Sequence, residues 1–556
     1  MRKNGLLSTV ACLAAAFIVQ AGPADAQTAA ALTGQVSSTE EGNMEGVVVS
    51  AKKDGSTVTV SVVTDSSGRF SFPAAKLEPG KYTLKARAVG YDLPGTITAD
   101  VATGKAATSQ LKLTKTRNLS AQLNNAEWLM SMPGTEEQKR FLLNCNGCHT
   151  YERIVKSTYD AQGFLQVFER MSGYYPGSMP TKPQRLAGTA TRDGMMSRGG
   201  ANALKVAEWL ASVNLSKTET REWPLKTLPR VKGKATQVVI TEYDLPNNMI
   251  QPHDVILDQQ GTVWYSDFGQ QFLGKMDAKT GKVTQYPIPV VKQGWPTGTL
   301  DLEADKDGKI WIGVMYQANI AKFDPMTEKF QQWPVPKEWQ TDAAQTGHLA
   351  VGATHVDGKV WIKNSDETNI YRLDVKTGKF EDLGNQTDPF NGRRIGTYGI
   401  HSDSQNNAYL LDFSSNNLVR IDAKTKALKF FKTPTEMSRP RRGRVDSQDR
   451  LWFAEYGGNA IGMLDPKTGE IKEWKVPTPW SAPYDALVDK HGDAWTGSML
   501  TDRVARLDTK TGQYTEYPLP RPTNIRRVFV DDRTKPGTLW VGSNHGASIV
   551  KIEPQS

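Results

Sequence analysis

Cysteine is scarce in this chain, whose 556 residues include only three. Cys12 lies in an apolar run near the N-terminus, and the other two are Cys145 and Cys148. With Cys12 set aside, there is no third thiol to complete a cysteine-rich zinc site. No later segment has an apolar run long enough to cross a bilayer, so we expect no transmembrane helix in the mature chain.

Clusters of basic and aromatic residues of the kind that bind nucleic acid are also lacking. The formal charge of +9 is spread along the chain, with one tight run at Arg439, Arg441, Arg442 and Arg444. This charge permits docking to an acidic redox partner, but an ordinary solvated surface is the simpler explanation. At this length we expect several domains, with enough chain to form large cores.

The two close cysteines belong to the motif Cys145-Asn146-Gly147-Cys148-His149, the pattern of a c-type haem attachment site. If both thiols face the same way on one helical turn, each can form a thioether to one haem vinyl group, and His149 can bind the iron. A thioredoxin-type pair would need a strand before it, whereas residues 136–143 predict a helix. The motif therefore predicts one covalent haem c held by Cys145, Cys148 and His149, with His149 as a metal ligand.

The N-terminus has the pattern of an export signal. Arg2 and Lys3 precede an apolar run over residues 6–19, and Ala24-Asp25-Ala26 supplies small residues for cleavage before Gln27. We therefore expect residues 1–26 to be a signal peptide that is removed together with Cys12, and the mature protein to be periplasmic. That compartment is oxidising, which suits the attachment of a haem to two cysteines.

Residues 118–222 predict a small α-helical domain around the motif, with helices at 136–143, 161–171 and 204–213. The segment resembles class I-like cytochromes c, in which the helix that carries the motif packs on a C-terminal helix. Electron transfer is the function that this resemblance implies, with a dehydrogenase or another cytochrome as redox partner.

Two methionines compete for the sixth position on the iron. Met171 ends an apolar helical face, where a methionine also serves as core filler, and Met179 lies in a loop. Short bacterial cytochromes of the kind this segment resembles carry an aromatic residue, a Val and then Arg-Met on the helix after the motif. The matching residues here are Phe164, Val167, Arg170 and Met171. The resemblance favours Met171 as the cofactor-binding metal ligand and leaves Met179 as the alternative.

Residues 30–115 predict a β-sandwich. Strand-like runs at 46–50, 57–63, 69–72 and 82–88 are separated by turn residues such as Asp65 to Gly68 and Pro79-Gly80. These turns, together with Phe70-Ser71-Phe72 and Gly90-Tyr91, resemble the carboxypeptidase regulatory-like domain, a prealbumin-like sandwich. In relatives such domains are attachment or carbohydrate-binding-like modules, which implies no catalysis of their own.

After a linker at 223–236, the chain repeats itself with a period of roughly 43 to 50 residues, the length of a four-stranded propeller blade. An Asp-x-x-Thr turn follows most repeats, and the residues at 241–246 copy those at 515–520. We therefore expect a C-terminal seven-bladed β-propeller over 237–556 whose last blade is completed by its first strand. The repeated pairs are Val263-Trp264, Ile310-Trp311, Val360-Trp361, Ala408-Tyr409, Leu451-Trp452, Ala494-Trp495 and Leu539-Trp540.

One repeat, with Trp452 to Tyr456, Ile461-Gly462 and Asp465 to Gly469, resembles the propeller of streptogramin (virginiamycin B) lyase. That lyase eliminates an ester-linked substrate with a metal, using His and Glu residues of its last blades. The corresponding places in this chain hold Tyr484, Asn524-Ile525-Arg526 and Asn544. The resemblance therefore implies the fold, whereas we expect the carbon-oxygen lyase chemistry to be absent or relocated.

Other polar residues could line the propeller channel. His253 lies on the first inner strand, and five acidic and three basic residues lie near the ends of other strands. They could form a funnel for a small polar ligand. The alternative, which we favour, is that these charges pair with one another in a polar channel. The acidic residues are Asp267, Glu303, Asp366, Asp412 and Glu455, and the basic ones are Arg441, Arg442 and Arg526.

Four functions are compatible with this multidomain chain. The haem motif favours a periplasmic c-type cytochrome that transfers electrons, with the propeller binding a substrate or a partner. A self-contained haem-dependent oxidoreductase, a lyase on the propeller and a non-catalytic envelope- or carbohydrate-binding protein are the alternatives. The sequence assigns no residue as catalytic.

Overall fold

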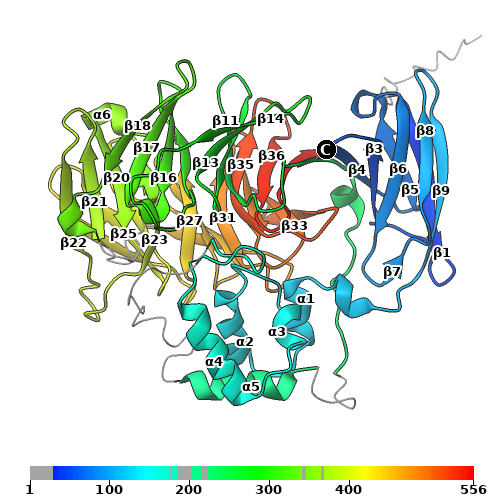
Figure 1. The fold of residues 1–556 in the computed structure, drawn as a ribbon, viewed down its shortest axis with the longest axis horizontal. Helices are drawn as coiled ribbons and strands as arrows, with labels where there is room; N and C mark the ends of the chain where they lie inside the picture. Colours follow the sequence, from blue (N-terminus) through cyan, green and yellow to red (C-terminus); the bar gives the residue numbers. More distant parts are fainter. Residues whose placement is uncertain are drawn as a thin grey trace, which may run out of the picture.

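The computed structural model describes residues 29–175, 177–184, 202–215, 223–340, 346–364 and 369–555. It contains a β-sandwich, a helical module and a β-propeller, with the helices below one face of the propeller (Figure 1). The expected signal peptide over 1–26, with Cys12, and the channel candidate Asp366 lie outside the described residues. In the described part of the chain, no helix has the length and apolar character needed to cross a membrane.

The first module has two β-sheets around one apolar core, as the turn pattern predicted. In one sheet β1 pairs with β2, β5 and β9, and in the other β3 lies between β4 and β6. Val36, Val49 and Phe72 are fully buried between the sheets. The strands are β1 (Ala30–Ser38), β2 (Gly42–Asn43), β3 (Val48–Lys53), β4 (Val58–Val63), β5 (Arg69–Pro73), β6 (Gly80–Arg87), β7 (Tyr91–Asp92), β8 (Ile97–Val101) and β9 (Ala107–Lys115).

The helical module confirms the two later helices and corrects the first. The helix expected at 136–143 ends at Arg140 and continues as a 3₁₀ turn over Phe141–Asn144, and residues 145–148 form a turn. The two motif cysteines therefore do not share a helical turn, because the backbone bonds tighten here, with Cys145 N donating to Leu142 O. The helices are α1 (Asn125–Ser131), α2 (Glu136–Arg140), α3 (Glu152–Val155), α4 (Ala161–Ser172) and α5 (Ala203–Val213).

The described residues from Val238 onward form seven four-stranded units around one axis. Each unit runs through its strands in sequence order. In most units the first strand contacts the first strand of the next unit, which places these strands innermost. The last unit is completed by β10 (Val238–Asp244), which pairs with β37 (Ser548–Pro554). The predicted seven blades and the predicted closure of the ring are both confirmed.

The blades follow one another without a change of order. Their strands are listed here by blade, from the innermost strand outward. Blades one to three contain β11 (Pro252–Leu257), β12 (Val263–Asp267), β13 (Phe272–Met276), β14 (Val283–Pro287); β15 (Leu302–Ala304), β16 (Ile310–Val314), β17 (Asn319–Asp324), β18 (Lys329–Pro334); β19 (Thr346–Ala350), β20 (Lys359–Asn364), β21 (Asn369–Asp374) and β22 (Phe380–Asn385). Blades four to seven contain β23 (Thr397–Ser402), β24 (Ala408–Asp412), β25 (Asn417–Ile421), β26 (Leu428–Lys432); β27 (Pro440–Val445), β28 (Leu451–Glu455), β29 (Ala460–Leu464), β30 (Ile471–Lys475); β31 (Pro483–Val488), β32 (Asp493–Ser498), β33 (Arg503–Asp508), β34 (Gln513–Pro518); β35 (Ile525–Asp531), β36 (Thr538–Ser543), and then β37 and β10.

Recurrent polar contacts explain why the repeats look alike. In the first blade the Trp264 indole N–H donates to Asp258 at 2.9 Å, and in the second Trp311 donates to Asp305 at 2.7 Å. The Asp-x-x-Thr turns behave as expected, since Asp277 accepts the backbone N–H groups of Lys279 and Thr280. An aspartate therefore stabilises each Asp-x-x-Thr turn by accepting backbone N–H groups. A second aspartate, before the second strand, accepts the N–H of the buried indole on that strand.

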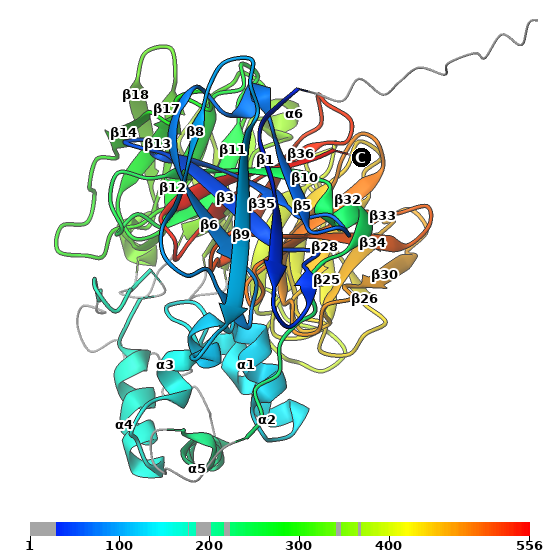
Figure 2. The same cartoon turned by 90° about the vertical axis from the view of Figure 1, so that its right-hand side faces the viewer.

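The sandwich and the propeller share one sheet, which the sequence did not predict. Strand β10 pairs on one side with β37 and on the other with β4, in a register that places Thr241 opposite Val60. The result is a continuous eight-stranded sheet that crosses the joint between the modules (Figure 2). The outer edge of the seventh blade is thus covered, and backbone hydrogen bonds set how the two modules sit together.

Candidate functional site

The helical module contains a cavity of ≈ 340 Å³. Cys145, Cys148 and His149 line it, and so do Met171 from α4 and Met179 from the loop that follows. All the residues predicted to hold a cofactor, with the alternative methionine, therefore converge on one space. Its size is typical of small-molecule sites. The rest of the lining is largely apolar and includes Phe141, Leu142, Ile154, Phe164, Val167, Phe168, Pro180, Pro183 and Leu210.

Tertiary contacts set the shape of the motif segment. The Tyr151 hydroxyl donates to Leu142 O at 2.7 Å, and the Tyr151 backbone N–H donates to the Asn125 side chain at 2.8 Å. Tyr151 is completely buried, so it fixes the chain on both sides of the motif. The rings of Phe141 and Phe168, 5.6 Å apart, join this segment to α4.

One hydrogen bond selects the tautomer of a neutral His149 ring. Its Nδ1 lies 3.0 Å from the backbone oxygen of Thr150. Because a carbonyl oxygen only accepts, Nδ1 donates, and the lone pair stays on Nε2. That is the tautomer an iron ligand needs, with the second nitrogen held by the backbone.

Both candidate methionines reach the cavity from different kinds of structure. Met171 is in the last turn of α4, whereas Met179 is in a tight loop. In this loop the Met179 N–H donates to Lys182 O at 3.1 Å, and the Lys182 N–H donates to Met179 O at 3.0 Å. Both side chains are partly buried. Both methionines therefore remain candidates for the sixth ligand.

The side of the cavity that meets solvent carries polar groups. Arg153 and Arg170 line it and are exposed, and Ser157 and Tyr174 line it as well. A group with carboxylates at its edge would find positive charge and hydrogen-bonding partners here.

The helical module covers one mouth of the propeller channel. Four lyase-equivalent positions meet there, and three of them, Tyr484, Asn524 and Asn544, have at most 1% of their surface exposed. Tyr484 belongs to the same apolar cluster as Trp128, Leu143 and Leu210 of the helical module. This mouth of the propeller is therefore covered by the chain's own helical module.

Deeper in the channel, charges from several blades pair with one another. Arg442 bonds both oxygens of Asp254, at 2.8 and 3.0 Å, and reaches Asp301 at 3.0 Å. Arg527 bridges Asp254 at 2.8 Å and Glu303 at 3.0 Å. Burial alone would raise the pKa of Asp254, but the two guanidinium groups overcome this and hold it well below its usual range. We call these five residues the channel ring.

His253 is already fully engaged by its neighbours. Its Nδ1 lies 2.7 Å from Asp254 and its Nε2 lies 2.9 Å from the Tyr484 hydroxyl. Burial lowers the pKa of His253 to about 3, so the ring is neutral, donating to Asp254 and accepting from Tyr484. His253, Glu303 and Arg442 therefore do reach the channel, but each is paired with another polar residue there. This is the arrangement that we favoured from the sequence.

Three other acidic candidates for the channel lining do not join the channel ring, which counts against the funnel. They end second strands rather than inner ones. Asp267 accepts the backbone N–H groups of Gln251 and Gly269, and burial raises its pKa to about 6. Asp412 accepts those of Gly396 and Ser414, and Glu455 is buried at the end of β28. Within the described ranges, no three His, Cys, Asp or Glu side chains are grouped so as to hold a metal ion.

Sequence reasoning missed part of the channel ring and its surroundings. Asp301 precedes β15, and His348, Asp485 and Arg527 lie on inner strands. His348 bonds Asp301 at 3.1 Å, and Asp485 lies 3.4 Å from Arg444. An alignment of the seven repeats in register would have grouped these residues, because each occupies a similar place near the start of its blade.

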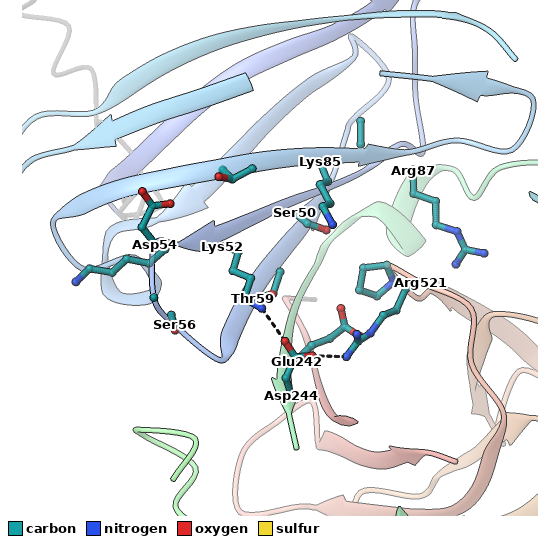
Figure 3. A pocket seen from close by; sticks show the side chains of 15 residues that line it. Ser50, Lys52, Asp54, Ser56, Thr59, Lys85, Arg87, Glu242, Asp244 and Arg521 are labelled. Carbon is teal, nitrogen blue, oxygen red and sulfur yellow. Dashed lines mark hydrogen bonds and ion pairs between the residues drawn. The ribbon is translucent and has the colours of Figure 1, made fainter. Parts of the chain in front are cut away.

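A second hollow, a cleft of ≈ 580 Å³, lies where the sandwich meets the propeller (Figure 3). Lys52 of the sandwich bonds Asp244 of β10 at 2.7 Å, and Arg521 bonds Glu242 and Asp244 at 2.9 and 2.7 Å. Arg87 reaches Asp502 in the same region. These ion pairs reinforce the shared sheet and hold the two modules in one orientation.

Two family models match parts of this chain, and several solved structures are similar to it. Residues 31–114 match the model of the carboxypeptidase regulatory-like domain, and residues 385–556 match that of the virginiamycin B lyase family. The structure of selenomethionine-substituted virginiamycin B lyase from Staphylococcus aureus is 22% identical, with a TM-score of 0.49, covering 57% of this chain and 99% of its own. For a streptogramin B lyase structure the values are 21%, 0.48, 58% and 99%.

The extracellular domain of a putative hybrid two-component system from B. thetaiotaomicron is 13% identical, with a TM-score of 0.42, over 56% of this chain and 40% of its own. None of the curated proteins matches. The chain therefore combines a carboxypeptidase regulatory-like β-sandwich and a virginiamycin B lyase-like β-propeller with a helical module between them in sequence.

Proposed function

We propose that this chain is an exported c-type cytochrome that transfers electrons, with one haem attached covalently in the helical module and the propeller as a partner- or substrate-binding platform. One observation carries the proposal. Cys145, Cys148, His149 and two methionines line one largely apolar cavity. The motif residues are neighbours in sequence, but the fold also brings Met171 of α4 and Met179 of the following loop to the same space. A covalent haem needs this combination of two thiols, an imidazole, a further ligand and an apolar surround.

The residues present fit the group. Cys145 and Cys148 would each add a thiol across one vinyl group, and His149 would bind the iron through Nε2, since its Nδ1 donates to Thr150. Met171 would be the sixth ligand, with Met179 as the alternative. When bound, the haem supplies the reversible one-electron chemistry of its iron.

The surrounding side chains would tune and orient this site. The aromatic rings of Phe141, Phe164 and Phe168 line the cavity and would keep water from a bound haem, which would favour the less charged, reduced state. Arg153 and Arg170 at the exposed side would bind the propionate carboxylates. A methionine ligand raises the reduction potential, which suits a protein that accepts electrons from a dehydrogenase.

The propeller supports this function better than lyase chemistry. The lyase-equivalent positions hold Tyr484, Asn524, Arg526 and Asn544, none of which is a carboxylate or a free base. They also face the helical module rather than an open mouth. We therefore assign the propeller a supporting role in electron transfer, with an external redox protein as the partner.

Absorption spectroscopy tests the proposal. The full chain with its signal is produced in a bacterium that matures c-type cytochromes, beside a variant with Cys145→Ala and Cys148→Ala. We expect a sharp reduced α-band in the periplasmic fraction of the wild type, with haem that stays on the polypeptide after denaturation, and neither in the variant. A wild type without the band would overturn the proposal.

The axial ligand is tested by two single variants. We expect Met171→Ala to lose the long-wavelength methionine-to-iron band of the oxidised protein and to lower its reduction potential, because a water or a weaker ligand replaces the thioether. Met179→Ala should keep both properties. The opposite pattern would assign Met179, and absence of the band from the oxidised wild type would exclude a methionine ligand.

A further inference from the structure

Side chains of the propeller hydrogen-bond to backbone oxygens of the motif segment. Two of its side chains converge on one carbonyl oxygen, that of Gly147 between the two cysteines. Arg526 Nη2 donates to it at 2.9 Å, and His545 Nε2 lies 3.1 Å from it. A carbonyl oxygen cannot donate, so His545 must be the donor in its contact.

Two further donors hold the carbonyls before Gly147. Asn524 Nδ2 donates to Asn146 O at 3.3 Å, and the Tyr456 hydroxyl donates to Leu143 O at 2.6 Å. The Asn146 side chain is only 2% exposed and lies 3.2 Å from the same hydroxyl. We call Tyr456, Asn524, Arg526 and His545 the mouth clamp, because all four project from the channel mouth onto this loop.

The members of the mouth clamp are themselves held in place. Arg526 Nε donates to the Asn524 side-chain oxygen at 2.9 Å, and the Arg526 guanidinium lies 5.0 Å from the centre of the Phe268 ring. Tyr456, Asn524 and Arg526 are at most 3% exposed. Donors fixed in this way hold the loop without having to reorganise.

The loop depends on these contacts because its own secondary structure is weak. Residues 145–148 form a turn, and the preceding segment is a short 3₁₀ turn. Arg439 adds a bond to the Asn144 side chain at 3.0 Å, and Arg140 donates back to Gly457 O at 2.9 Å. Contacts in both directions make the loop and the mouth one rigid unit.

We propose that the channel mouth is the second half of the haem site: the mouth clamp positions the motif loop, and the Arg526 charge raises the reduction potential of the haem. This inference rests on the proposed function. Tyr456, Asn524, Arg526 and His545 act as positioning residues, since they bond the backbone of the loop rather than the cofactor. A positive charge held beside the loop favours the iron state with one more electron.

Redox titration of the loaded full-length protein tests the charge. Arg526→Gln keeps an amide donor and removes the charge, and we expect the equilibrium constant for reduction to fall about tenfold, a shift of about 59 mV for one electron. Arg526→Lys should stay closer to the wild type because it keeps the charge. The matched control is Arg506→Gln on β33. This arginine pairs with Asp493 of β32, away from the loop, so the substitution should leave the potential unchanged.

Hydrogen exchange tests the positioning role and does not require haem. Asn524→Asp has the same shape but presents a carboxylate oxygen to Asn146 O, so we expect faster amide exchange over residues 141–149, with the outer blade strands unchanged. Wild-type exchange in Asn524→Asp, or a wild-type potential in Arg526→Gln, would overturn the inference. Absence of covalent haem from the wild type would instead overturn the proposed function. The exchange measurement would then still test whether the mouth clamp holds the motif loop.

Discussion

Glu455 shows how the fold sets the protonation of a single residue. It has no exposed surface, and its carboxyl group lies beside that of Glu473. Burial, followed by repulsion from Glu473, raises the pKa of Glu455 from 4.5 to about 9. The unfolded chain loses this proton first as the pH rises, so the free energy of unfolding falls between pH 4.5 and about 9.

Replacing Glu455 by glutamine should therefore stabilise the protein at neutral and alkaline pH. The amide never has to be protonated on folding, so we expect a gain of about 4 to 5 kcal/mol near pH 8 and less than about 1 kcal/mol near pH 5. Thermal unfolding of Glu455→Gln across this range measures it, with the exposed Glu436→Gln as control. A gain that does not change with pH would contradict this explanation.

The channel ring predicts a large loss at a residue with no chemical role. Asp254→Asn leaves Arg442 and Arg527 without the carboxylate that both contact, so the free energy of unfolding should fall by about 3 to 5 kcal/mol. Glu78→Gln breaks the exposed pair with Lys53 and should cost less than about 1 kcal/mol. Urea denaturation of both variants measures the two losses in the free energy of unfolding. Equal losses would contradict the claim that the channel ring stabilises the propeller.

At the residue scale, the sequence predicted what local spacing encodes. Cys145, Cys148 and His149 could be grouped because they are neighbours, and the helical spacing of Met171 with Phe164 could be read in the same way. The channel ring could not be grouped in this manner, since Asp254 and Arg527 come from blades at opposite ends of the propeller sequence. Asp267 and Asp412 are candidates for the channel from the sequence alone, because a strand end fixes a position but not the direction of a side chain.

At the scale of elements, β10 matters most because it belongs to two modules. Val60→Pro in β4 removes a backbone donor between β3 and β10, and we expect a loss of at least about 1 kcal/mol and a separate, earlier unfolding of the sandwich. Calorimetry with limited proteolysis of the segment 116–124 measures this. Val60→Thr keeps the donor and the β-branched shape, and it should unfold like the wild type. One shared transition in Val60→Pro would mean that the shared sheet does not couple the modules.

Elements with a clear period were predicted well, and those decided by tertiary contacts were not. The apolar faces of 161–171 and 204–213 correspond to α4 and α5 within one residue at each end. The helix expected at 136–143 ended early, because the following residues turn so that Leu142 and Leu143 enter the core while their carbonyls bond Tyr151 and Tyr456. No pattern within that segment could have revealed two tyrosines placed elsewhere in the chain.

For the whole molecule, the decisive feature is that the helical module closes the propeller mouth. The sequence predicts three modules that follow one another along the chain, with a linker at 223–236. In the structure that segment packs on the helical module, where the Leu228 N–H donates to Glu127 at 2.9 Å. The motif loop bonds residues more than three hundred positions away in sequence. Contacts of such separation leave no trace in composition or period, so the modules could be predicted but their assembly could not.

The central claim is that Cys145 and Cys148 carry a haem, and the intact mass of the purified mature protein tests it most directly. The chain is produced with its signal in a host that attaches haem to a known c-type cytochrome in the same culture. We predict a mass equal to residues 27–556 plus one haem, and the polypeptide mass alone for the Cys145→Ala, Cys148→Ala variant. A wild type that weighs no more than its amino acids, while the known cytochrome is loaded, would contradict the account.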